Sequence, residues 1–106
     1  MPRWLWFALI RIRARAESRS LRFTHKARTE MARLGLDETD GAEILMGLTL
    51  ADSEARLRSR RTGEWLYVFK PKISGTRVYV KLVLRDDCEV ISFHEEPDPE
   101  AGRETP

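Results

Sequence analysis

The side chains best suited to chemistry gather between residues 64 and 95, where apolar and polar residues alternate as in β-strands. Tyr79 and Lys81 fall on one face of such a stretch, and His94 lies near the end of the next. Free imidazole, with a pKa of about 6.5, can give or take a proton near neutral pH. A phenol and cations beside the imidazole can bind the oxygens of a phosphate. This combination favours RNA binding, and RNA cleavage by attack of the RNA's own 2′-hydroxyl.

The candidate residues divide into a catalytic group and a wider basic face. The catalytic group has His94 as general acid or base, Tyr79 as a transition-state donor, and three phosphate-holding cations, Lys81, Arg58 and Arg60. The RNA-binding face is expected to add Arg56, Lys70, Arg77 and Arg85. The alternative interpretation is structural, because a histidine at a strand end and alternating arginines also occur on ordinary solvated strands.

Charge is strongly segregated along the chain. Residues 1–36 carry nine basic and two acidic side chains, a balance of +7, whereas residues 86–106 carry one basic and eight acidic, a balance of −7. The net charge of the whole chain is only +2. Because a basic surface attracts a polyanion by releasing its counterions, the basic part favours a nucleic-acid partner.

Length and composition limit the class of protein. The 106 residues suffice for one domain with one sheet and two or three helices. A single cysteine, Cys88, cannot form an internal disulfide, so a cytoplasmic protein is expected. No metal-ligand spacing or cofactor motif is present, and neither metal nor cofactor is expected. The apolar run 4–10 is too short to span a membrane, although surface contact with a membrane stays an alternative.

Periodicity predicts an α+β fold in which two helices pack on an antiparallel four-stranded meander sheet. Thr24 and Asp37 are the candidate N-caps of the helices, at about 24–34 and 37–48. Alternation predicts four strands, near 55–60, 65–69, 77–85 and 88–94. The domain division expected from this pattern is a flexible basic extension at 1–20, the functional domain at 21–96 and a disordered acidic tail at 97–106.

Four segments carry a family pattern: LGLD at 34–37, ILMGLTLAD at 44–52, GEWLYVFKPKISGTRVYVKL at 63–82 and CEVISFHEE at 88–96. In this order and spacing they resemble the MqsR family of bacterial type II toxins, the motility quorum-sensing regulator mRNA interferases. The resemblance covers residues 21–96, about three quarters of the chain.

This resemblance implies a RelE-like ribonuclease fold and metal-independent cleavage of mRNA. It also implies inhibition by a cognate antitoxin that combines a zinc-binding region with a helix-turn-helix. Tyr79 occupies the place of the family's active-site tyrosine, whereas His94 replaces a lysine and Leu66 a glutamine. These departures bear on the family's preference for GCU sites more than on the nuclease class. The family's lysine in the first strand has three possible counterparts, Arg56, Arg58 and Arg60.

Two other functions fit the same residues. A non-catalytic, regulatory RNA-binding module would use the same basic face without cutting RNA. A protein-interaction domain would instead use the edge of the sheet to pair with a strand of a partner.

Overall fold

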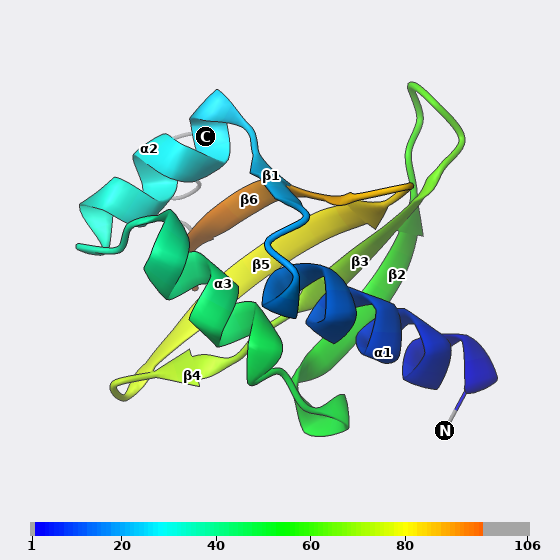
Figure 1. Ribbon diagram of the computed structural model, residues 1–106, viewed down its shortest axis with the longest axis horizontal. Coiled ribbons are helices and arrows are strands. Elements are labelled where there is room, and N and C mark those ends of the chain that lie inside the picture. The colour runs from blue at the N-terminus through cyan, green and yellow to red at the C-terminus, as the bar shows by residue number, and fades with distance from the viewer. Residues whose placement is uncertain (1, 97–106) are drawn as a thin grey trace, which may run out of the picture.

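A computed structural model describes residues 2–96, which form three helices and one sheet (Figure 1). The helices are α1 (Arg3–Glu17), α2 (His25–Arg33) and α3 (Glu38–Met46), and a 3-10 turn follows at Leu50–Asp52. The strands are β1 (Leu21–Phe23), β2 (Ser53–Arg58), β3 (Trp65–Phe69), β4 (Lys72–Ile73), β5 (Thr76–Leu84) and β6 (Cys88–Glu95). The acidic tail expected at 97–106 lies outside the described residues.

The α+β class is confirmed, and the predicted four-stranded antiparallel meander is present as β2-β3-β5-β6. Three details of the prediction are wrong. The described residues contain a third helix, α1, and the sheet is mixed because β1 pairs with β6 in parallel. A sixth strand, β4, also pairs with the start of β5. A three-residue strand is too short to produce a visible alternation, so only its long-range partner reveals it.

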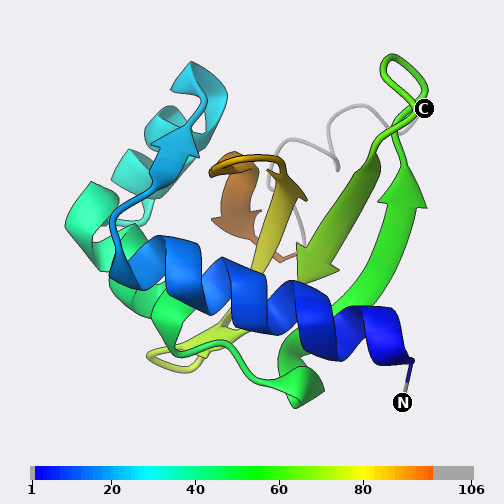
Figure 2. The same cartoon turned by 45° about the vertical axis from the view of Figure 1, so that its right-hand side comes forward.

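Residues 3–17, expected to belong to a flexible extension, form the helix α1. Leu5, Leu9, Ile12 and Ala16 recur at helical spacing, and all four are buried in the core. The helix crosses one face of the sheet and lies beside α3 (Figures 1 and 2). No helix among residues 2–96 is both long and apolar enough to cross a lipid bilayer.

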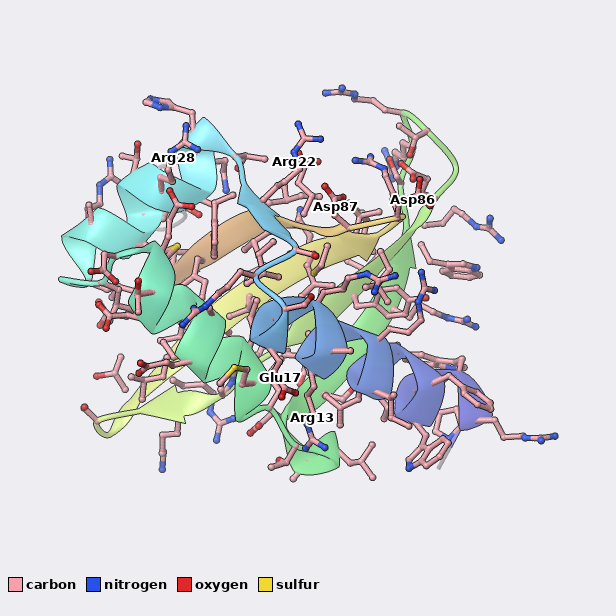
Figure 3. The ribbon with its side chains drawn as sticks, in the orientation of Figure 1. Arg13, Glu17, Arg22, Arg28, Asp86 and Asp87 are labelled. Atoms are coloured by element: carbon pink, nitrogen blue, oxygen red, sulfur yellow. The ribbon has the colours of Figure 1, made fainter. Side chains whose placement is uncertain are left out.

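The arginines of α1 have structural partners. Arg13 donates from Nε to the carbonyl oxygen of Leu48 at 2.9 Å, which ties α1 to the segment after α3 (Figure 3). Arg11 reaches the carbonyl oxygen of Arg85 at 3.1 Å. Some of the basic side chains in the N-terminal third therefore donate hydrogen bonds to backbone carbonyls of the same domain.

The two predicted helices and their caps are confirmed. Thr24 accepts the N–H of Ala27 at 3.0 Å, and Asp37 forms a reciprocal capping box with Asp40. Gly41, within α3, is needed for packing, since a Cβ there would lie 2.7 Å from the end of the Met31 side chain. The glycine thus lets α3 approach α2 closely.

Beyond the end of β1, α2 and its N-cap supply hydrogen-bond partners for backbone groups on the outer edge of β6. A carboxylate oxygen of Glu30 accepts the N–H of Phe93 at 2.8 Å, and the N–H of Thr24 donates to the carbonyl of Val90 at 3.0 Å. These contacts cover a strand edge that would otherwise be open to another chain. On the other side of the sheet, β2 has no further strand beside it among residues 2–96.

The faces of the sheet have different surroundings. Phe69, Val80, Leu82 and Phe93 point toward the helices and form the core with them. Residues that alternate with these on β3, β5 and β6 point to the far face, on which none of the described helices lies (Figures 1 and 2). The far face carries the candidate site.

Candidate active site

Tyr79 of β5 and His94 of β6 lie opposite each other in the antiparallel register. Their rings are stacked, with centroids 4.9 Å apart and planes inclined by 12°. The structure therefore brings these two sequence-predicted residues together on the far face. A single substrate group could contact both rings.

A β-bulge determines that His94 faces this side. Counting by twos from Cys88 and Val90, both buried, would place position 94 on the helix face. The register shifts between the pairs Lys81–Ser92 and Leu82–Val90, so Ile91 is the extra residue. Because one additional residue reverses the alternation, His94 emerges beside Tyr79.

Hydrogen bonding and burial set the proton positions of the stacked pair. His94 Nδ1 lies 2.9 Å from the carbonyl oxygen of Glu95. A carbonyl can only accept, so Nδ1 donates, and the neutral ring carries its acceptor lone pair on Nε2. Burial raises the pKa of the Tyr79 phenol above its usual value, and the positive charge of Lys70 partly opposes that rise. The phenol is thus a hydrogen-bond donor throughout the physiological pH range.

Lys70, which follows β3, belongs to the same region and is held by two carboxylates. Its Nζ lies 3.2 Å from an oxygen of Glu96 and 3.5 Å from an oxygen of Glu54. The bond to Glu96 is the main cause that raises the pKa of Lys70, so the ammonium stays charged. Arg77 donates to the carbonyl oxygen of Lys70 at 2.9 Å.

Lys81 lies two residues after Tyr79, on the same face, and opposite the buried Ser92. Within residues 2–96 its ammonium has no hydrogen-bond or ion-pair partner. A second lysine, Lys26 of α2, donates to the hydroxyl of Ser92 at 3.1 Å and pairs with Glu30 at 2.9 Å. Sequence reasoning missed Lys26, because nothing in its local sequence connects it with position 92.

The structure does not bring Arg58 and Arg60 to the stacked pair. Arg56 and Arg58 lie opposite Tyr67 and Trp65, on the helix face of the sheet. Arg60 is exposed in the turn between β2 and β3. Two of the three predicted phosphate-holding cations, and Arg56 as well, are therefore remote from Tyr79 and His94.

Arg85 points to the far face but lies near the opposite end of β5, where acids neutralise it. Glu64 accepts two hydrogen bonds from its guanidinium, both of 2.8 Å, and Glu89 accepts a third at 3.1 Å. Of the RNA-binding residues predicted from the sequence, Lys70 and Arg77 lie near the pair, whereas Arg56 and Arg85 do not.

The Glu64–Arg85 pair predicts a stability loss in acid. Arg85 lowers the pKa of Glu64 from 4.5 to about 2. A carboxyl whose pKa is lower in the folded state stabilises the fold above its unfolded pKa, and this contribution disappears as pH falls from about 4.5 toward 2. We expect Glu64→Gln to make the free energy of unfolding, measured by urea denaturation, less dependent on pH in this range. Glu43→Gln, at an exposed position without an ion pair among residues 2–96, should retain it.

Metal-binding and thiol groups contribute little to the site. Among residues 2–96, no three His, Cys, Asp or Glu side chains are grouped so that they could hold a metal ion. Cys88 is buried, and burial raises the pKa of its thiol to about 12, so it is not a nucleophile.

Comparison with known proteins adds the family. None of the curated proteins compared with the chain matches it. A family model described as "Motility quorum-sensing regulator, toxin of MqsA" matches residues 6–95, from the first turns of α1 to the end of β6. The match includes most of the helix that the sequence resemblance had left out. The chain belongs to this family of toxins, whose description names an antitoxin partner.

Proposed function

We propose that this toxin is a metal-independent endoribonuclease that cleaves mRNA in the cytoplasm. The main support is the stacking of Tyr79 on His94, at 4.9 Å, on a sheet face that also holds Lys70 and Lys81. A donor that stays protonated, a base and fixed positive charge are the components that cleavage by an internal 2′-hydroxyl requires. The fold is proposed to be of the RelE-like ribonuclease type, as the resemblance implies.

In the proposed reaction, Nε2 of His94 takes the proton of the 2′-hydroxyl as its oxygen attacks the adjacent phosphorus. Tyr79 donates a hydrogen bond to a non-bridging oxygen, where negative charge develops. The bond from phosphorus to the 5′-oxygen breaks, and the ammonium of Lys81 gives that oxygen a proton. The products are a 2′,3′-cyclic phosphate and a free 5′-hydroxyl.

Lys70 is proposed to take the phosphate-binding role that the sequence had assigned to Arg58 and Arg60. Its ion pairs with Glu54 and Glu96 are only partly buried, so solvent weakens them. A phosphate that enters the site can therefore compete for the ammonium. Arg77, two residues before Tyr79 on the same strand face, is proposed to extend this contact along the RNA.

The antitoxin partner is proposed to block RNA access to the site. From the resemblance we expect a protein with a zinc-binding region and a helix-turn-helix. Since RNA must reach the far face of the sheet, a partner that covers this face would inhibit without altering the catalytic groups.

We expect Tyr79→Phe to lower the cleavage rate of single-stranded RNA by about 10²-fold, the usual effect of removing one transition-state donor. The control is Tyr67→Phe, which removes the other tyrosine hydroxyl, on the helix face, and should cleave like the parent protein. Rates would be measured with EDTA present, and the product ends identified.

Three outcomes would contradict the proposal in different ways. Full activity of Tyr79→Phe would remove the tyrosine from the mechanism. Loss of all activity in EDTA would refute metal independence. RNA that is bound tightly but never shortened would favour the non-catalytic RNA-binding module.

A further inference from the structure

A stack of arginine and tryptophan side chains lies on the helix face of the sheet, away from Tyr79 and His94. The guanidinium of Arg56 is 4.4 Å from the ring centroid of Trp4 and 3.9 Å from that of Trp65. Arg58 lies 4.0 Å from the same Trp65 ring. Two guanidinium groups cannot occupy one ring face at this distance, so the order is Trp4, Arg56, Trp65, Arg58. We name these four residues the arginine ladder.

The ladder places its cations between aromatic rings of two elements and leaves most of their donors available. Trp4 comes from α1, whose N-terminal half lies beside β2 and β3 (Figure 2). The centroid of its ring lies 5.8 Å from that of the Tyr67 ring. Among residues 2–96, Arg56 has no hydrogen-bond or ion-pair partner, and Arg58 uses one donor, for the carbonyl of Gly63 at 2.8 Å. A guanidinium group that lies over an aromatic ring can still offer the N–H groups at its edge to an anion.

Further groups of the same kind follow the ladder residues along β2 and α1. Arg60 and Arg61 are exposed in the turn that continues from β2, and their side chains have no carboxylate partner among residues 2–96. Phe7 follows Trp4 by three positions, so the two are neighbours on α1, and it is 54% exposed. Trp6, whose ring centroid lies 5.3 Å from that of Phe7, is 48% exposed but stands two positions from Trp4 and therefore faces away from the ladder. Exposed aromatic rings next to unpaired cations are typical of surfaces that bind single-stranded nucleic acid.

We propose that the arginine ladder binds single-stranded RNA outside the cleavage site, as a second contact for the same strand. This inference rests on the proposed nuclease function. The two guanidinium carbons lie 3.9 Å and 4.0 Å from one ring centroid and are thus at most about 8 Å apart, comparable with neighbouring phosphates in a strand. Exposed Phe7, on the same side of α1 as Trp4, then offers a stacking partner for a base.

The two sites lie on opposite faces of the sheet and are offset along its strands. From β5, which holds Tyr79, the sheet continues through β3 to the edge strand β2, about 10 Å away at the usual strand spacing. Arg56 and Arg58 pair with Tyr67 and Trp65, which lie level with the end of β5, three to five residues or about 10–17 Å beyond Tyr79. RNA that reaches the ladder from the stacked pair must therefore run diagonally across the sheet and pass around the β2 edge. An acidic protein segment could supply similar charges but has no need of the exposed rings, and therefore RNA is the favoured occupant.

The test measures RNA affinity against salt concentration in the His94→Ala background, so that binding is read without cleavage. We expect Arg56→Gln/Arg58→Gln to bind a single-stranded oligoribonucleotide at least about tenfold more weakly. Loss of two phosphate contacts should also reduce the slope of log affinity against log salt by about 1.4. The control, Arg19→Gln/Arg22→Gln, removes the same charge beside β1, where Arg22 lies near Asp87 (Figure 3), and should keep the slope.

Arg60→Gln/Arg61→Gln is a second variant whose side chains pack against nothing in the core, and it too should lower the slope. In the active background, ladder variants should slow cleavage of a long RNA but not of a short one that covers only the cleavage site. Unchanged slopes in both double variants would overturn the ladder proposal, even if the parent protein cleaves RNA. Loss of antitoxin binding alone, with RNA binding intact, would also overturn it. An uncleaved RNA whose binding still depends on the ladder would refute only the nuclease function.

Discussion

His94→Ala is expected to lower the rate of RNA cleavage by about 10²–10⁴-fold, the range usual for loss of a general acid or base. The expected loss is large because His94 is the only histidine on the far face. Its Nδ1 is tied to the Glu95 carbonyl, which places the acceptor nitrogen, Nε2, on the opposite side of the ring. Stacking against Tyr79 fixes the plane of the ring.

The other histidine provides the matched control for this experiment. His25 is exposed in the first turn of α2, so His25→Ala should leave cleavage unchanged. Both variants would be compared with the parent protein on one defined single-stranded RNA, after circular dichroism has shown that they are folded. Equal rates for His94→Ala and His25→Ala would remove the imidazole from the mechanism.

Local signals in the sequence were sufficient for the elements that local interactions determine. Thr24 and Asp37 are short polar residues before apolar helical patterns, and the structure has the corresponding caps. The strand at 65–69 was predicted with the bounds that it has, because Pro71 and the Ser74-Gly75 turn follow it. Such features depend on neighbours along the chain, which a single sequence displays.

Elements that depend on distant partners were predicted poorly. β1 exists because Leu21, Arg22 and Phe23 pair with β6, far along the chain. α1 had a visible signal, the apolar spacing of Leu9, Ile12 and Ala16, but its arginines and the absence of a side-chain cap obscured it. A helix stabilised by packing does not need a strong cap of its own.

The candidate site likewise combines residues that the sequence indicates with an arrangement that depends on distant strand pairing. The sequence indicated Tyr79 and His94 by residue type, but the bulge at Ile91 that brings their rings together is an irregularity of pairing. Lys70 reaches the site from the end of β3, which depends on the register of three strands. The arginines of β2 were assigned to the wrong face, since alternation shows which residues share a face without showing which face is covered.

Ile12→Ala is expected to destabilise the domain by about 2–5 kcal/mol, the usual cost of truncating a buried isoleucine. Ile12 is 0% exposed in the core cluster, where α1 packs with α3 against the sheet. A domain of this size is stable by only about 5–15 kcal/mol, so the loss would be a large share of the total. The free energy of unfolding would be measured from urea denaturation. The slope of that free energy against urea concentration should be the same in the variant and the parent protein if only stability has changed.

Ile10→Ala is the control, because it makes the same chemical change in the same helix at a position that is 43% exposed. It should cost less than about 1 kcal/mol, since little apolar surface returns to water. Equal, small effects would mean that α1 is dispensable for the fold, as a flexible extension would be. A large difference would show that α1 packs into the core as part of the domain, because only the buried face of the helix would then contribute to stability.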